Sequence, residues 1–214
     1  MEQGDPRGEL IRAQLADESP VIDDASARCW VGNIGELIRW GEGVRFERGF
    51  LSGCTVDALD GKAAAAPEWT TIEVLDVKGS IAEIGRYPLR SLRAVGGLHS
   101  RDVTTLLRSP VAPELQAVGL RRVLKADRSR TWDLLCELPR LRFLAVGAFA
   151  FDPSLADHPL LEKIELLSYP ARELVTPSAP WSRTRIAGFR VKQRCTNSDG
   201  VWLPNYNKLA RRGS

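Results

Sequence analysis

A short pattern of apolar positions recurs along the chain: an apolar residue, two variable residues, an apolar residue, one variable residue and a last apolar residue. Clear copies occupy residues 72–77, 115–120, 141–146 and 161–166. Weaker copies occupy residues 51–56, 89–94 and 186–191. The copies start 21, 17, 26, 26, 20 and 25 residues apart. Such near-regular spacing predicts a repeat architecture in which each copy forms one short strand.

The spacing within each copy has a structural reason. The last two apolar positions are two residues apart, so on a strand both side chains point to the same face. One such strand cannot bury its apolar face alone, and neighbouring coils must stack to share a core. Repeats of about 20–29 residues with this strand pattern are typical of leucine-rich repeats. The sequence therefore predicts an α/β fold, a leucine-rich-repeat-like solenoid with short parallel strands over residues 49–197. The alternative is a generic α/β domain with short strands.

Helix signals lie between some of the predicted strands. Ser100 is placed to cap a short helix that Pro110 ends. Asp127 or Ser129 is placed to cap a second helix, whose inward face contains Trp132. Residues 58–66 predict a third helix. The other connecting segments are short and rich in proline, which predicts turns or 3₁₀ segments.

The two ends differ from the predicted repeats. Residues 1–48 contain a helical segment over Gly8–Leu15 and an apolar stretch over residues 25–40. They predict an N-terminal helical cap. Residues 198–214 contain aromatic and then basic residues, which predict a C-terminal cap followed by a basic tail.

Two segments of the N-terminal region resemble a known family. Residues 4–15 read GDPRGELIRAQL, which resembles the helix of the bacterial repeat-companion domain of the myxobacterial and planctomycete type. Residues 46–51, FERGFL, resemble the segment that leads into the first strand of such proteins. The resemblance implies that repeats follow this domain and that no catalytic residues are carried over. It also implies a truncated cap, because the family's domain has a further helix upstream.

Composition fits a folded domain, with 214 residues of which 43% are hydrophobic and 27% charged. No stretch approaches the roughly 20 apolar residues of a membrane helix, and the acidic start does not resemble a signal peptide. We therefore expect a cytoplasmic protein without membrane contact. The cysteines and histidines stand alone, without the paired spacing of a metal site, so we expect no metal, no cofactor and no disulfide. They are Cys29, Cys54, Cys136, Cys195, His99 and His158.

Catalytic motifs such as GxSxG, a phosphate loop or HExxH are absent, so we expect no enzyme activity. On the predicted strands, the side chains between the apolar positions face the concave side. One such row reads Thr55, Asp76, Arg93, Gly119, Ala145, Glu165 and Arg190. Phe143 lies among small residues, with Arg93 and Arg121 on one side and Lys163 and Glu165 on the other.

An aromatic anchor in an apolar centre with a charged rim is typical of partner-binding surfaces. The sequence thus predicts a non-catalytic adaptor or accessory subunit that binds a protein partner. The alternative interpretation is that the small residues only allow the strands to curve.

The C-terminal region is strongly basic, through Arg183, Arg185, Arg190, Lys192 and Arg194. These residues lie near Trp181, Phe189 and Trp202, and such interleaving could grip phosphates and stack bases. A nucleic-acid-associated accessory protein is therefore the alternative function, although a solvated basic end or contact with an acidic protein is the simpler interpretation. Net charge runs from −6 in residues 1–60 to +7 in residues 181–214, within a total of +3. We expect a monomer in moderate salt.

Overall fold

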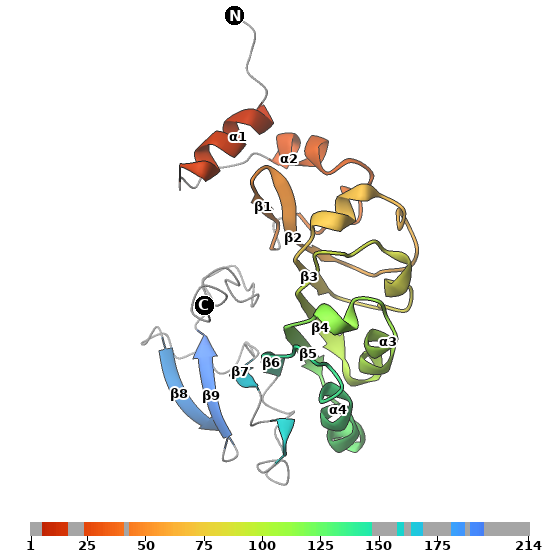
Figure 1. Cartoon of the computed structure of the whole chain (residues 1–214), viewed down its shortest axis with the longest axis vertical. Helices are drawn as coiled ribbons and strands as arrows, with labels where there is room; N and C mark the ends of the chain where they lie inside the picture. The colour runs from red at the N-terminus through yellow and green to blue at the C-terminus, as the bar shows by residue number, and fades with distance from the viewer. Residues whose placement is uncertain are drawn as a thin grey trace, which may run out of the picture.

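The computed structural model describes residues 6–16, 24–40, 43–146, 158–160, 164–168, 181–186 and 189–194, which form a mixed α/β fold (Figure 1). The strands are β1 (Arg45–Glu47), β2 (Phe50–Val56), β3 (Val74–Val77), β4 (Ala94–His99), β5 (Ala117–Arg122), β6 (Phe143–Val146), β7 (Glu165–Ser168), β8 (Trp181–Ile186) and β9 (Phe189–Arg194). The α-helices are α1 (Pro6–Leu15), α2 (Asp24–Trp30), α3 (Val103–Leu107) and α4 (Arg128–Leu135). The 3₁₀ helices are η1 (Gly32–Ile34), η2 (Pro67–Thr71), η3 (Ile84–Arg86), η4 (Ser100–Asp102), η5 (Ala112–Glu114) and η6 (Lys125–Asp127).

The strands form one sheet whose order nearly follows the chain: β1-β2-β3-β4-β5-β6-β7-β9-β8. Neighbouring strands are parallel from β2 to β7 and between β7 and β9. Antiparallel hairpins, β1–β2 and β8–β9, close the two edges. Both α3 and α4 lie on the same side of the sheet (Figure 1). The prediction of short parallel strands in an α/β fold is confirmed for this sheet.

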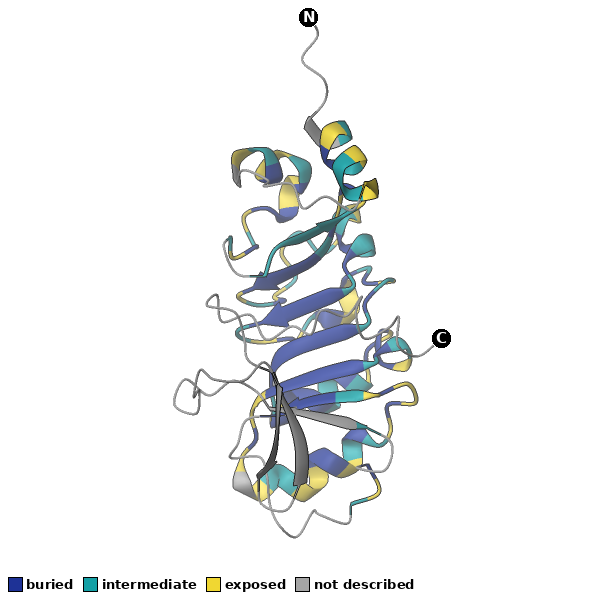
Figure 2. Cartoon of the chain, turned by 90° about the vertical axis from the view of Figure 1, so that its left-hand side faces the viewer, coloured by how far each residue is buried: buried dark blue, intermediate teal, exposed yellow. Residues whose placement is uncertain are grey.

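The core lies between the sheet and the segments that connect its strands (Figure 2). Its strand positions are those that the apolar pattern predicted: Leu75, Val77, Val118, Leu120, Leu144 and Val146 are all fully buried. Trp69 of η2 and Trp132 of α4 extend the same core from the connecting side. The predicted core residue Ile164 is only half-buried, just before β7.

The pairing of β3 with β4 corrects the predicted repeat at residues 89–94. Leu75 pairs with Val95, so the position equivalent to Ile72 is Leu92 and not Leu89. With this register, the predicted step of 17 residues becomes 20, and the irregularity in the spacing disappears.

A bulge at Gly97 explains the misplaced repeat. Val95 pairs with Val118, but the next core pair joins Leu98, and not Gly97, to Leu120. One extra residue therefore stands between the two core positions of β4, which hides the apolar spacing. Gly97 has a φ of 75°, and a Cβ at this position would collide with the carbonyl oxygen of Val77. Only glycine suits this conformation and this space.

The last two predicted repeats are displaced by two residues. Leu144 of β6 pairs with Leu166 of β7, where the pattern aligned it with Ile164. The predicted repeat at residues 186–191 is wrong, because Ile186 and Phe189 pair with each other across the β8–β9 hairpin. In the observed register Ser168 lies opposite Val146, so the apolar pattern does not continue into the aligned part of β7.

The connecting segments follow the predicted helix signals in part. Helix α3 begins at Val103, and the Asp102 carboxylate accepts the His99 backbone N–H at 2.9 Å, whereas Ser100 was the predicted cap. Helix α4 follows Asp127 directly, as predicted. Residues 58–66 form turns instead of a helix, and the short helix of this segment is η2.

Gln14 joins the N-terminal helix to the sheet. Its side-chain amide donates to the Phe46 carbonyl oxygen at 2.7 Å, and its Oε1 accepts the Gly49 N–H at 2.9 Å. The predicted helix α1 is thereby held against the β1–β2 hairpin, and its Leu10 is buried. The Trp30 ring of α2 packs edge-on against Phe46 of β1, with 5.7 Å between ring centroids.

Candidate functional site

The sheet face opposite the core carries the residues that the sequence assigned to the concave surface. Register places Ala117 beside Ala94 on one side and Phe143 on the other. Phe143 in turn pairs with Glu165 of β7. In the next row, Thr55 pairs with Asp76 and Gly119 with Ala145. Small side chains therefore dominate the middle of this face, as predicted.

The small-residue centre is buried. Ala117 is 2% exposed, and Ala94, Ala145 and Thr55 are similarly buried. Phe143 is half-buried, so it is the part of the centre that a partner can reach. The partner-binding surface stays a prediction, with Phe143 at the start of β6 as the accessible side chain of its centre.

The predicted charged residues do not form one ring around Phe143. Arg93 precedes β4 and does not share a row with Asp76, which pairs with Gly96. Its guanidinium lies 3.4 Å from the Glu114 carboxylate of η5, which also binds Arg140. Arg121 is exposed at the other end of its strand, near the end of β5. Lys163 lies outside the described residues.

A hollow of about 640 Å³ lies before the start of β6, next to Phe143 in the chain. Its apolar lining comes from Leu138, Pro139, Leu141 and Leu160, and its polar lining from Gln116, Cys136, Arg140 and Arg142. The lining is more polar than apolar, so the hollow differs from the mostly apolar pockets that are typical of small-ligand sites. This hollow was not predictable from the sequence, because its lining comes from three separate connecting segments.

The predicted basic C-terminal residues lie on the β8–β9 hairpin. In its antiparallel register, Arg183 pairs with Lys192 and Arg185 with Arg190. Arg194 pairs with Trp181 at the open end of the hairpin. The predicted cap and tail over residues 198–214, including Trp202, lie outside the described residues.

Asp76 is a buried carboxylate, although the sequence predicted it only as one member of a row on the concave face. It is 4% exposed on the sheet face away from the core, with Oδ2 3.1 Å from Lys78 Nζ. Among the described residues, its Oδ1 has no hydrogen-bond partner. Burial, and then the nearby charge of Asp76, raise the pKa of the Cys54 thiol to about 12. Cys54 therefore stays protonated at neutral pH and is a poor nucleophile.

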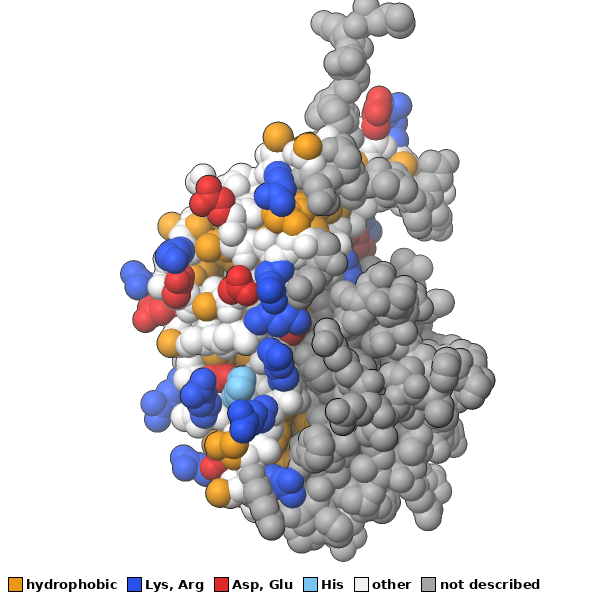
Figure 3. Space-filling view, turned by 180° about the vertical axis from the view of Figure 1, so that it is seen from behind, with side chains coloured by type: hydrophobic (Ala, Val, Ile, Leu, Met, Phe, Trp, Pro, Cys, Tyr) orange, Lys and Arg blue, Asp and Glu red, His pale blue; other side chains and the backbone are white. Residues whose placement is uncertain are grey.

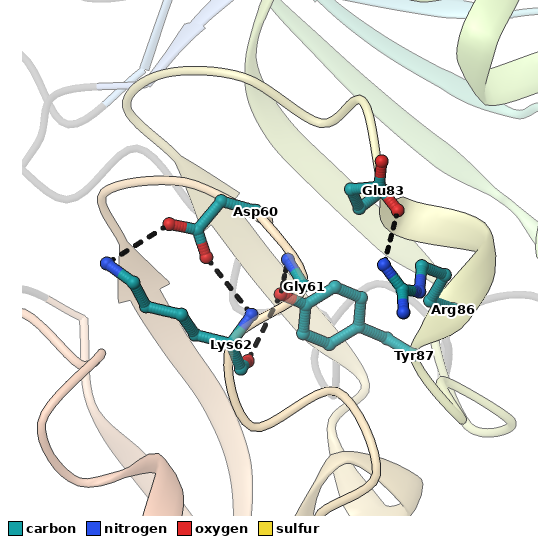
Figure 4. A network of polar contacts seen from close by, with 6 residues as sticks. All are labelled: Asp60, Gly61, Lys62, Glu83, Arg86 and Tyr87. Atoms are coloured by element: carbon teal, nitrogen blue, oxygen red, sulfur yellow. Dashed lines mark hydrogen bonds and ion pairs between the residues drawn. The ribbon is translucent and has the colours of Figure 1, made fainter.

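A polar network around Tyr87 stabilises the connecting segment after β2 (Figure 4). The Tyr87 hydroxyl accepts the Gly61 N–H at 2.9 Å and donates to the Lys62 carbonyl oxygen at 3.3 Å. The ring packs edge-on against Trp69 at 5.0 Å, and burial is the largest cause that raises the pKa of Tyr87. The Lys62 backbone N–H lowers the pKa of Asp60. These contacts are structural, because they tie loop backbone to a core ring.

Within the described ranges, no group of three or more His, Cys, Asp or Glu side chains is arranged to hold a metal ion. Cys29, Cys54 and Cys136 carry thiols, and Cys195 lies outside the described residues. None of the helices in the described part of the chain has the length and apolar character needed to cross a bilayer. No known protein family, curated protein or solved structure matches the chain.

Proposed function

We propose that the protein is a non-catalytic protein-binding module, an adaptor or accessory subunit, whose partner contacts Phe143 and the hollow beside it. Phe143 carries the proposal, because it is the accessible aromatic side chain of the small-residue centre, and the residue before it, Arg142, lines the hollow of about 640 Å³. Aromatic anchors are where binding energy concentrates in protein interfaces.

The charge around the hollow defines the partner's chemistry. Arg140 and Arg142 line it and are exposed, and the Glu114 carboxylate neutralises part of the charge of Arg140 and Arg93. Arginine binds carboxylates through two parallel hydrogen bonds. The partner segment therefore presents an apolar side chain flanked by acidic residues.

The architectural part of the proposal is a leucine-rich-repeat-like solenoid over residues 49–197, with a helical cap over residues 1–48 and a C-terminal cap over residues 198–214. It is supported by the sheet order, which follows the chain, and by the 20-residue step that the β3–β4 register restores. Stacking of similar coils creates the extended surfaces that such binding modules use. The thiols of the described cysteines are consistent with a cytoplasmic location.

The proposal includes a cap of the repeat-companion type. Its support is that Gln14, in the segment GDPRGELIRAQL, bonds the backbone of Phe46 and Gly49, in the segment FERGFL. The two segments on which the resemblance rests therefore contact each other and form one structural unit.

The experiment is a quantitative affinity capture from the native host, read by mass spectrometry. The unchanged protein is compared with Phe143→Ala and with Phe50→Ala, which removes an exposed phenylalanine at the other end of the sheet. We expect Phe143→Ala to weaken a specific partner by more than about 1 kcal/mol and Phe50→Ala to have little effect, while both variants keep a cooperative thermal transition. Equal capture by all three proteins would show that the binding surface does not include Phe143.

The β8–β9 hairpin supports the second candidate function, a nucleic-acid-associated accessory protein. Its register places Arg183 opposite Lys192 and Arg185 opposite Arg190, so four basic residues belong to one short hairpin. Such a concentration of basic residues suits a polyanion. Strong dependence of nucleic-acid affinity on salt, lost in Arg183→Ala/Arg185→Ala, is the expected sign of this function.

A further inference from the structure

The described middle of the chain is more basic than the total charge indicates. Residues 86–142 contain 12 basic and 5 acidic side chains, and 11 of the 12 are arginines. From behind, lysine and arginine side chains outnumber acidic ones over the lower part of the described surface (Figure 3). These basic residues are not part of the β8–β9 hairpin, and most of them do not line the hollow at β6.

The ends of β4 and β5 bring part of this charge together. His99 pairs with Arg122, so Arg101 and Arg121 lie close to the same point of the sheet. Neighbouring strands are about 4.8 Å apart, which keeps the backbones of these residues close. The Ser100 hydroxyl donates to the Asp127 carboxylate at 3.1 Å and so holds the start of α4, the helix that contains Arg130, close to η4.

The acidic residues near these arginines accept hydrogen bonds from other groups of the chain. Asp102 is buried and accepts the His99 N–H, with Arg101 Nε 4.0 Å from its other oxygen. Asp127 accepts the Ser100 hydroxyl. Arg121, Arg122 and Arg130 are exposed, and no acidic partner is found for them among the described residues. Arg121 and Arg122 are consecutive at the end of β5, so their side chains leave opposite faces of the strand. We name Arg101, Arg121, Arg122 and Arg130, which lie around this end of the sheet, the arginine edge.

The composition of the arginine edge favours phosphate over protein. Protein interfaces have an apolar or aromatic centre, and among the described residues of this edge the only large exposed hydrophobic side chain is Leu124. Single-stranded nucleic acid is bound by stacking on exposed aromatic rings, and the described residues of this edge offer none. Exposed arginines that surround neither an apolar centre nor an aromatic ring are suited to the phosphates of a duplex backbone. They bind these phosphates without reading the sequence.

We propose that the arginine edge binds the phosphodiester backbone of double-stranded nucleic acid. The site is separate from Phe143, so it goes beyond the proposed protein-binding function and lets one molecule hold a protein and a duplex together. Binding is independent of sequence, and it weakens steeply with salt because counterions are released from the duplex.

The test measures fluorescence anisotropy of a short, labelled, random-sequence DNA duplex with the full chain at several salt concentrations. We expect Arg121→Ala/Arg122→Ala to lower affinity at least about tenfold at low salt and to reduce the slope of log affinity against log salt by about 2. Arg121→Lys/Arg122→Lys keeps the charge and retains most of the salt slope.

The matched control is Arg90→Ala/Arg108→Ala, which removes the same charge from two exposed arginines that also lack an acidic partner among the described residues. We expect its affinity to stay close to that of the unchanged protein. Phe143→Ala also keeps duplex binding, which separates this proposal from the protein-binding function.

Three results would overturn the proposal. Equal losses in the two double variants would show attraction to net charge alone. Loss only in Arg183→Ala/Arg185→Ala would place the site on the β8–β9 hairpin. Binding of poly-glutamate, with no binding of the duplex, would show that the edge takes an acidic protein.

Discussion

At the scale of single residues, Gly97 has the largest effect on the alignment of the strands. Its positive φ places one additional residue in β4, and its missing side chain leaves room for the Val77 carbonyl oxygen and the Asp76 carboxylate. The bulge keeps Leu98 in the core, so the apolar face of β4 is complete although its spacing is irregular.

We predict that Gly97→Ala destabilises the protein by at least about 2 kcal/mol, because alanine is strained at this φ and its Cβ meets backbone that cannot move aside. Urea unfolding, followed by the fluorescence of the buried tryptophans, measures the change. Gly8→Ala is the control, because nothing lies within 4 Å of its Cβ position in α1. A Gly97→Ala protein as stable as the control would show that the bulge can relax.

The burial of the Cys54 thiol makes the stability of the protein depend on pH. Its thiol has the ordinary pKa of 9.0 in the unfolded chain and a pKa of about 12 in the folded protein. Between these values the unfolded state releases a proton that the folded state retains, so stability falls as pH rises above 9.0. Below pH 9.0 both states are protonated and the group contributes no pH dependence.

We therefore predict that the free energy of unfolding declines more steeply with pH in the unchanged protein than in Cys54→Val, by at most about 1.4 kcal/mol per pH unit. Urea unfolding on both sides of the ordinary thiol pKa gives the two slopes. Tyr87, whose pKa is also raised, is present in both proteins and cancels in the difference. Parallel slopes would mean that the Cys54 thiol reaches water in the folded state.

At the scale of elements, the apolar pattern predicts a strand correctly where its spacing is strict. This holds for β3, β5 and β6, because each places two core side chains two residues apart. It fails at β4, where the bulge inserts a residue, and at β7 and β9, where the register places polar residues such as Ser168 at positions of the apolar pattern.

The candidate site was predictable only in part, for a similar reason. Phe143 occupies the predicted strand position, because its neighbours fix the register. The burial of Ala117 and the lining of the hollow depend on contacts between distant segments, and a local pattern carries no information about them. The same holds for Arg93, whose ion pair with Glu114 joins two connecting segments.

The contact between α1 and the β1–β2 hairpin depends on one side chain. We predict that Gln14→Ala raises the hydrogen exchange of the α1 amides and lowers stability by about 1–2 kcal/mol, because the Gly49 N–H loses its acceptor. Exchange measured by mass spectrometry over residues 6–16 tests this, with the exposed Glu9→Ala as control. Unchanged exchange in Gln14→Ala would show that the packing of Leu10 alone holds the helix.

At the scale of the whole molecule, charge is distributed unevenly along the chain. Residues 1–60 carry −6 and residues 181–214 carry +7. Attraction between exposed charges of different molecules is screened within about 8 Å at physiological salt, so it yields only weak contacts.

We therefore predict a monomer at about 0.15 M salt, with any self-association confined to low salt. Sedimentation velocity at two ionic strengths measures this. A stable oligomer that does not depend on salt would indicate an apolar interface, for which Leu15, Phe50 and Leu124 are the large exposed hydrophobic side chains among the described residues. Leu10 and Ile11 are not the source, because Leu10 is buried and Ile11 is half-buried.

The order of strands in the sheet has a mechanical consequence. Each strand from β2 to β6 is bonded to the strands that precede and follow it in the chain, and no strand in this run bridges distant parts of the sequence. Force applied to the two ends of the chain would therefore load one strand pair at a time. The molecule would unfold in a series of small steps from one edge of the sheet. After release it could refold from the strands that remained paired.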